Sequence, residues 1–186
     1  TVLVDFGMFQ GDREDEARAL LDGARASPES APWVALERAR MLLLDDRLDE
    51  ARALLAEPGS GAGSPPAPRF PDHPDNLLLL GRVHVRAGEA ERAVPYLARY
   101  VSAAPLAPEA PAAWHMLAQE ALARGDATAG RAYLERARTS GLWQGYYRAR
   151  RLQVREHPDE PLPRLGLAQL WLQADEPGRA RAVLRE

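Results

Sequence analysis

Residues 73–105, HPDNLLLLGRVHVRAGEAERAVPYLARYVSAAP, decide the fold. Apolar side chains recur there at steps of three and four in two segments, which predicts two amphipathic helices. The first helix is expected to end near Ala87, Gly88 breaks the pattern, and Pro105 closes the second helix. The stretch therefore predicts a helix, a sharp turn and a second helix.

The same order of residues returns along the chain, and such internal repetition decides the architecture. A preceding pair of helices is predicted over residues 32–56, with its break at Asp45-Asp46. A following pair breaks at Gly125-Asp126, and a last pair spans residues 162–186. A single pair cannot bury its apolar stripe alone, so stacked neighbouring pairs are expected to share a continuous core.

Three segments organise the chain. Residues 1–56 hold the N-terminal pairs, the first truncated or degenerate, and residues 74–186 hold the others. Between them, residues 57–73 are rich in Gly, Ser and Pro, so we expect an exposed insertion rather than a domain boundary or a binding loop. Residues 1–10 are open to two interpretations, a first helix, which we favour, or a β-rich segment.

Residues 142–156 depart from the pairing because they predict one helix without a partner. Ser140-Gly141 is a plausible stop before it, and His157-Pro158-Asp159 is a firm stop after it. We therefore favour a single additional helix over a degenerate first helix at residues 141–145. The stripe of this helix is expected to contain Gly145, Ala149 and Leu152.

Two central pairs carry a family resemblance. The residues are Leu80-Gly81, Gly88, Ala93, Leu97 and Pro105 in one pair, and Trp114, Leu117-Ala118, Gly125-Asp126, Leu134 and Ala137 in the next. They resemble the tetratricopeptide repeat, a helix-turn-helix unit of about 34 residues. The resemblance implies an all-α fold, a right-handed α-α superhelix (solenoid) of antiparallel helix pairs that binds a protein or peptide on its concave face. By repeat position, that face would include Arg82, Arg86, His115, Gln119 and Gln169.

Composition narrows the chemistry. The net charge of -3 gives no general attraction to nucleic acid or to anionic membranes, and no apolar run is long enough to span a bilayer. The chain has no cysteine and no lysine, which excludes disulfides, thiolate chemistry and Schiff bases. The compartment stays open.

No motif supports catalysis, a metal or a cofactor. His73, His84, His115 and His157 lack the spacing of a ligand set. His73 and His157 each lie in a His-Pro-Asp turn before a helix, and loop-forming polar residues are the favoured interpretation of the histidines. There is no Gly-rich phosphate loop and no nucleophile elbow, and the acidic pairs lie at helix ends. We therefore expect no enzyme activity within these residues.

Aromatic and basic side chains have a structural and a functional interpretation. Trp33, Trp114 and Trp171 occupy helical positions that predict core packing rather than ligand stacking. Three arginines fall on one helical face and form a possible anion patch: Arg148, Arg151 and Arg155. A solvated face paired with acidic neighbours is the favoured interpretation, followed by a contact with an anionic protein and then by nucleic acid.

These observations favour a non-catalytic scaffold that binds a protein or peptide. An alternative is an accessory or dimerisation module of a larger enzyme whose catalytic domain lies outside this segment. Binding of nucleic acid through residues 146–155 is a third, less favoured hypothesis.

Overall fold

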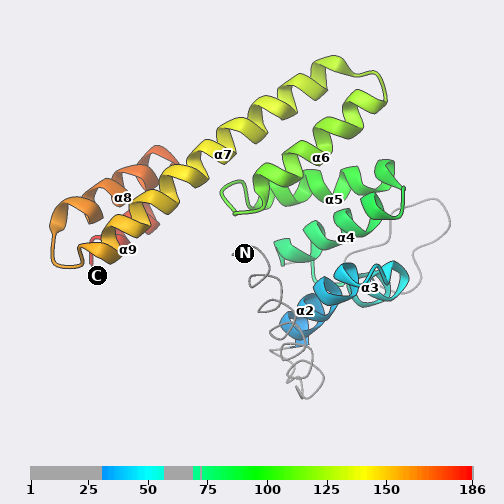
Figure 1. Ribbon diagram of the computed structural model, residues 1–186, viewed down its shortest axis with the longest axis horizontal. Coiled ribbons are helices and arrows are strands. Elements are labelled where there is room, and N and C mark those ends of the chain that lie inside the picture. The colour runs from blue at the N-terminus through cyan, green and yellow to red at the C-terminus, as the bar shows by residue number, and fades with distance from the viewer. Residues whose placement is uncertain (1–30, 57–68, 72, 186) are drawn as a thin grey trace, which may run out of the picture. The chain divides into compact units, whose positions relative to one another are not determined.

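The computed structural model describes residues 31–56, 69–71 and 73–185, and these residues form helices and turns without a strand (Figure 1). The fold is therefore all-α, as predicted. The expectations for residues 1–10 and for most of the insertion at 57–73 lie outside the described residues. The helices are α2 (Ala31–Leu44), α3 (Leu48–Leu55), α4 (Pro74–Arg86), α5 (Ala90–Ala103), α6 (Ala110–Ala123), α7 (Ala127–Glu156), α8 (Pro161–Gln173) and α9 (Pro177–Val183).

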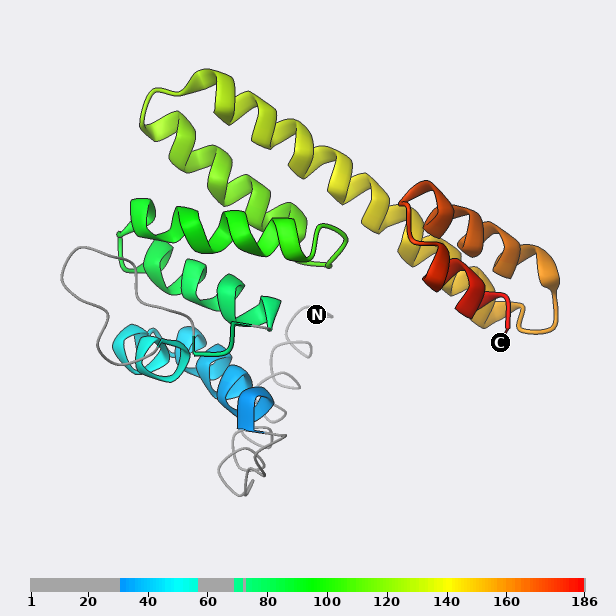
Figure 2. The same cartoon turned by 180° about the vertical axis from the view of Figure 1, so that it is seen from behind.

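The chain divides into two compact units, Thr1–Ala103 and Ala104–Glu186. In unit 1, α2 packs on α3, α4 packs on α5, and both α2 and α3 contact α4 (Figure 2). In unit 2, α6 packs on α7, α7 on α8, and α8 on α9. The helices on either side of the insertion, α3 and α4, belong to the same unit, so the insertion does not separate the units.

Every described helix pair reverses at the same kind of turn. One residue in each turn has a positive φ: Asp46 (60°), Gly88 (74°), Gly125 (80°) and Asp175 (57°). The next amide donates to the carbonyl five residues back, as from Glu89 to His84 at 2.8 Å and from Asp126 to Ala121 at 2.9 Å. These are Schellman turns, in which glycine is preferred and aspartate is tolerated. The predicted breaks are confirmed, including the break at Asp45-Asp46, which contains no glycine.

Helix α4 forms the centre of unit 1. Its neighbours surround it, which explains why the run Leu77, Leu78, Leu79 and Leu80 is buried rather than amphipathic. A Cβ atom added to Gly81 would lie 2.5 Å from Leu97 Cδ2, so only glycine permits this approach of α4 and α5. Gly81 therefore allows the first helix of this pair to approach the second closely.

A buried histidine connects the two helix pairs of unit 1. His84 is 1% exposed, its Nδ1 lies 2.7 Å from Glu89 Oε2, and its ring stacks on Tyr96 at 5.4 Å. The same Glu89 oxygen accepts a hydrogen bond from Arg52 of α3 at 3.1 Å. The interpretation of His84 as a polar loop residue is therefore wrong, because its ring fills the core while Glu89 supplies a polar partner.

The surroundings of His84 disfavour its charged form. Burial lowers the pKa of His84 more strongly than the hydrogen bond to the Glu89 carboxylate raises it, and Arg52 and Arg92 lower it further. The Nε2 atom is buried without a hydrogen-bond partner among the described residues, so a second proton there would remain unpaired. The hydrogen bond from His84 lowers the pKa of Glu89.

We predict that acid weakens unit 1 in two stages. In the unfolded chain, the imidazole of residue 84 takes up a proton below a pH of about 6.5, whereas the lowered pKa of folded His84 keeps its ring neutral to a lower pH. The unfolding free energy therefore falls as the pH falls from about 6.5. A further loss begins below about 4.5, where the unfolded Glu89 carboxyl becomes protonated. Urea unfolding followed by circular dichroism at pH values of about 7.5 and 5.5 measures the first stage.

Two variants check the assignment to His84. His84→Gln should lower the urea midpoint near neutral pH and reduce its change between the two pH values. His115→Gln, at an exposed position of α6, should keep the wild-type pH dependence. An equal pH dependence in the wild type and in His84→Gln would contradict the prediction.

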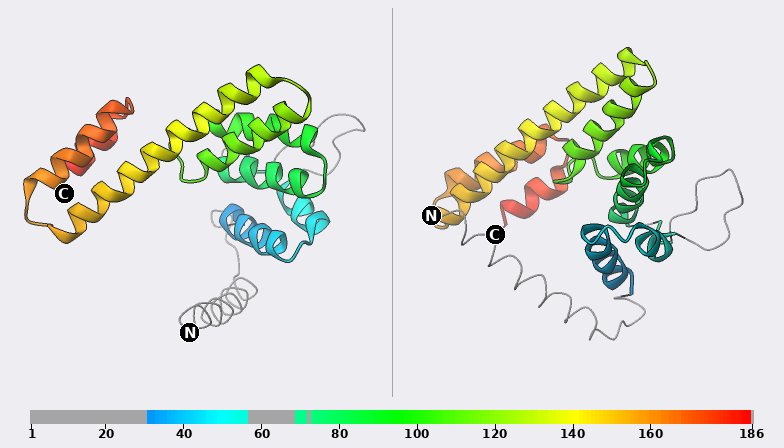
Figure 3. Two further views of the ribbon diagram at one scale, coloured as in Figure 1. Left: turned by 45° about the horizontal axis from the view of Figure 1, so that its top comes forward. Right: turned by 45° about the vertical axis from the view of Figure 1, so that its right-hand side comes forward.

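Helix α7 is continuous over 30 residues, about 45 Å, and its two halves have different partners. Figure 1 and Figure 3 show α6 beside the N-terminal half, and α8 and α9 beside the C-terminal half. The predicted stop at Ser140-Gly141 is wrong, since residues 142–156 continue the second helix of the preceding pair. The predicted stop at His157-Pro158-Asp159 is confirmed, because α7 ends at Glu156.

The helix continues because side chains beyond Gly141 are anchored. Gln144 is 5% exposed and donates from Nε2 to the carbonyl of Leu106 at 2.6 Å. Trp143 and Tyr147 pack against Trp171 of α8, each with ring centroids 5.1 Å apart from it. A glycine inside a helix is unfavourable by only about 1 kcal/mol relative to alanine, so this packing outweighs Gly141 and Gly145.

The inward stripe of this segment also differs from the prediction. The expected stripe Gly145, Ala149 and Leu152 is exposed, whereas Trp143, Tyr147 and Val154 pack on the core formed by α8 and α9. In the N-terminal half, Leu134 is 37% exposed and the neighbouring Tyr133 stacks on Trp114 instead. The stripe of Gly145, Ala149 and Leu152 was misassigned because the C-terminal half of α7 packs against α8, and not against α6, so a different side of α7 is buried.

Two of the three tryptophans predicted to lie in the core are covered. Trp171 is 5% exposed, and Trp114 is half-buried beside Tyr133. Trp33 is 55% exposed and contacts the edge of the His73 ring, so its predicted core position is wrong. It lies near the start of α2, where Leu36 is the first fully covered side chain.

Substitution of Gly141 tests the continuity of α7. A Cβ atom at Gly141 or Gly145 would meet nothing within 4 Å, and neither residue has a positive φ. We predict that Gly141→Ala stabilises unit 2 by about 0.5–1 kcal/mol, because alanine loses less backbone entropy in a helix. Chemical denaturation of the full chain measures the difference.

Gly125→Ala is the matched control, because Gly125 has a φ of 80° and a side chain there is strained. It should destabilise the protein by about 1 kcal/mol. Destabilisation by Gly141→Ala comparable to that of Gly125→Ala would indicate a left-handed stop at residue 141 and would contradict a continuous helix.

Candidate functional site

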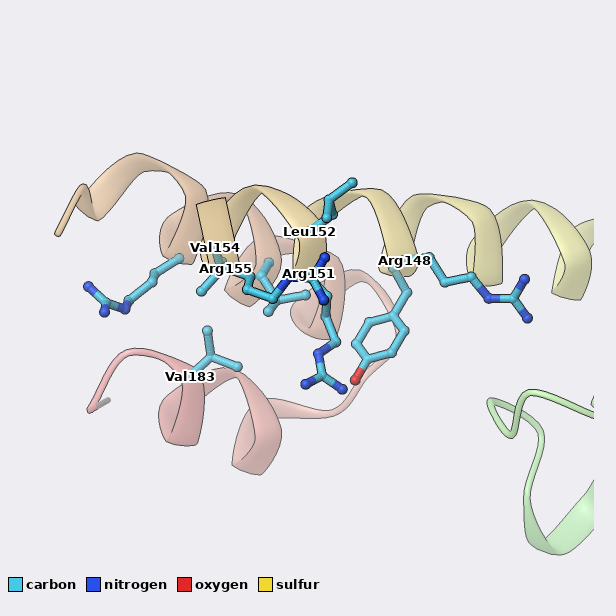
Figure 4. A pocket seen from close by; sticks show the side chains of 9 residues that line it. Arg148, Arg151, Leu152, Val154, Arg155 and Val183 are labelled. Atoms are coloured by element: carbon cyan, nitrogen blue, oxygen red, sulfur yellow. The ribbon is translucent and has the colours of Figure 1, made fainter. Parts of the chain in front are cut away.

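Unit 2 contains an open groove between α7 and α9, with α8 at its base. We call this hollow, of about 650 Å³, the α7–α9 groove. Val154 of α7 and Val183 of α9 face one another across it, and Arg151 reaches from α7 toward α9 (Figure 4). Its lining residues are Tyr147, Arg148, Arg151, Leu152, Val154, Arg155, Arg164, Leu167 and Val183.

Aromatic packing supports the wall formed by α7. Trp143 stacks on Tyr147 at 5.2 Å with an interplanar angle of 10°, and both rings contact Trp171. Contacts of this kind contribute about 0.5–1.5 kcal/mol per pair beyond the burial of area. The Tyr147 side of the groove is therefore held in place before any ligand binds.

Four arginines surround the groove. Arg148, Arg151 and Arg155 come from α7 and are exposed, whereas Arg164 comes from α8 and is half-buried. The Arg151 guanidinium lies 6.0 Å from the centroid of the Tyr147 ring, within the range of a cation–π interaction. Together they form a positive rim around apolar walls.

None of these four guanidinium groups forms an ion pair or a hydrogen bond with a residue that the structure describes. The expectation that Arg148, Arg151 and Arg155 pair with acidic neighbours is therefore wrong for the described residues. Elsewhere in the described chain, some arginines pair with carboxylates, as Arg40 does with Asp75 at 2.7 Å and Arg138 with Glu135 at 2.6 Å. The other such arginines are Arg47, Arg52, Arg92, Arg124 and Arg179. The groove thus concentrates positive charge in a chain whose net charge is -3.

The structure brings together the three arginines of the predicted anion patch. Sequence reasoning placed Arg148, Arg151 and Arg155 on one helical face, and all three line the groove. It missed Arg164, Val154 and Val183. No local pattern identifies Arg164, because its role depends on how α8 packs against the extended part of α7.

The predicted concave-face residues are divided between the two units. Arg82 and Arg86 belong to unit 1, where Arg82 is half-buried and the Arg86 guanidinium donates to the carbonyl of Leu43 in α2. Arg86 therefore links two helix pairs. This contact gives Arg86 a structural role, whatever else it binds.

The remaining three residues of that set lie in unit 2. His115 and Gln119 are exposed one turn apart on α6, beside the N-terminal half of α7. Gln169 is exposed on α8 and lines a small hollow of about 190 Å³ with Tyr146, Arg150 and Gln173. Helix α8 packs on the other half of α7, so Gln169 is not part of the α6 surface.

The described residues limit two other kinds of site. Among them, no three His, Asp or Glu side chains lie close enough together to hold a metal ion. Likewise, none of the described helices is both long enough and apolar enough to cross a membrane.

No family model, curated protein or solved structure matches the chain. The site must therefore be interpreted from its own geometry.

Proposed function

We propose that this chain is a non-catalytic scaffold of tetratricopeptide-like helix pairs that binds a segment of another protein. Repeated helix pairs with equivalent turns support the tetratricopeptide-like solenoid as the architecture. In this proposal the α7–α9 groove is the principal binding site. The concave face with Arg82, Arg86, His115, Gln119 and Gln169 remains a further predicted surface.

One observation carries the assignment to the groove: four arginines without a described carboxylate partner surround an open apolar hollow. Like charges at this spacing repel one another, and an anionic ligand relieves that repulsion. The apolar walls gain free energy when they are removed from water, which an inorganic ion cannot achieve. A protein segment provides both carboxylates and apolar side chains.

Charge reversal in the groove tests this function. Tagged wild-type chain is incubated with an extract of the organism that encodes it, and retained proteins are quantified by mass spectrometry. We expect Arg148→Glu/Arg151→Glu to reduce retention of a specific partner at least about tenfold, since repulsion replaces attraction at the rim. Nuclease treatment of the extract should leave this retention unchanged.

The matched control is Arg131→Glu/Arg138→Glu, which makes the same change of charge at exposed positions in the other half of α7. It should retain the partner as the wild type does, and circular dichroism should show all three proteins folded. Identical sets of retained proteins for the wild type and the groove variant would contradict the assignment. Loss of retention after nuclease treatment would instead favour nucleic acid.

A further inference from the structure

We propose that the partner segment in the α7–α9 groove is an amphipathic α-helix with acidic residues at steps of three and four beside an apolar stripe. This inference rests on the proposed function and specifies the chemistry of the partner. Three features of the groove support it: the spacing of its arginines, its apolar interior and its aromatic support.

The arginine spacing matches that of a neighbouring helix. Arg148, Arg151 and Arg155 are three and four residues apart on a continuous helix, so the outer two are separated by about 10 Å along its axis. A helix lying along α7 places carboxylates at the same steps of three and four. An extended strand presents side chains on one face about every 7 Å and does not reproduce the shorter step.

The groove interior requires apolar side chains. Val154 and Val183 are half-buried and face each other, and Leu167 at the base is 6% exposed. Leucine or methionine from a partner can enter this hollow of about 650 Å³ and complete its packing. A nucleic-acid backbone would pair with the arginines and leave these walls in contact with water, so an acidic amphipathic helix fits the groove better.

The groove is rigid, which favours a partner that fits its existing shape, such as a regular helix. The Trp143, Tyr147 and Trp171 rings fix one wall, and continuous α7 fixes the arginine register. The groove loses little conformational entropy on binding, and helix-in-groove recognition exploits such a surface. The rim of the groove is positively charged although the chain as a whole is negative, so acidic residues of the partner complement it.

The test uses the full chain and synthetic peptides. The matched peptide contains about 18 residues of Glu, Leu and Ala, long enough to form a helix, with Glu at steps of three and four flanking a Leu stripe. A second peptide has the same composition in an order that distributes Glu around all faces. A single-stranded oligonucleotide of about 12 nucleotides provides the polyanion probe. Binding is measured by fluorescence anisotropy.

We expect the matched peptide to bind at least about tenfold more tightly than the reordered peptide, because only the matched peptide joins carboxylates to an apolar stripe. Arg148→Glu/Arg151→Glu should remove this preference, and Arg131→Glu/Arg138→Glu should retain it. Arg155→Gln, a milder variant that keeps the fold, should weaken the matched peptide by about threefold through loss of one charge contact.

Two results would overturn the inference. Equal affinity for the two peptides would show that helical register is irrelevant; the proposed function would survive if the captured partner still depended on Arg148 and Arg151. Tighter binding of the oligonucleotide than of either peptide, with the same dependence on these arginines, would overturn both the inference and the protein-binding assignment.

Discussion

A single residue in the left-handed conformation reverses the chain in each described pair of helices, and the packing of both units follows from these turns. The turn is so short that the two helices must lie antiparallel and in contact from their first residues. Close contact then demands small residues, as at Gly81 against Leu97 and at Gly130, where an added Cβ would lie 2.5 Å from Leu122. Where aspartate replaces glycine, as at Asp46 and Asp175, packing of the pair offsets about 1 kcal/mol of backbone strain.

The groove arises where two helices of a pair differ in length. Helix α7 has 30 residues and its partner α6 has 14, so the second half of α7 requires another covering surface. Helix α8 supplies it through Trp171 and also forms the last pair with α9. Because α9 has only 7 residues, it contacts α8 but leaves the side of α7 that carries Tyr147 and Arg151 partly open. The α7–α9 groove is thus a consequence of unequal helix lengths.

Much of this fold follows from local sequence, whereas the site depends on packing. Apolar periodicity and turn residues predicted the helix pairs because a residue such as Gly88 acts within a few positions of itself. The break expected at Ser140-Gly141 was also predicted from local sequence. It does not form, because contacts of Trp143 and Gln144 with residues distant in the sequence outweigh the local preference for a helix end. The face bearing Arg148 and Arg151 could be predicted from helical spacing. Arg164 and Val183 could not, since their places depend on how α8 and α9 pack.

The chain is acidic as a whole, but its α7–α9 groove is basic, so different parts of its surface differ in their attraction for an acidic partner. Electrostatic screening limits exposed charges to a range of about 8 Å at physiological ionic strength, so an approaching acidic helix senses local charge rather than the net charge of -3. Elsewhere on the described surface, arginines such as Arg40 and Arg138 are paired with carboxylates and offer less attraction. At the groove, arginines without described carboxylate partners would attract the proposed helix, and the apolar walls would bind only the face that carries its apolar stripe. In the proposed complex, charge would select the place of binding, and the hydrophobic walls would select the orientation.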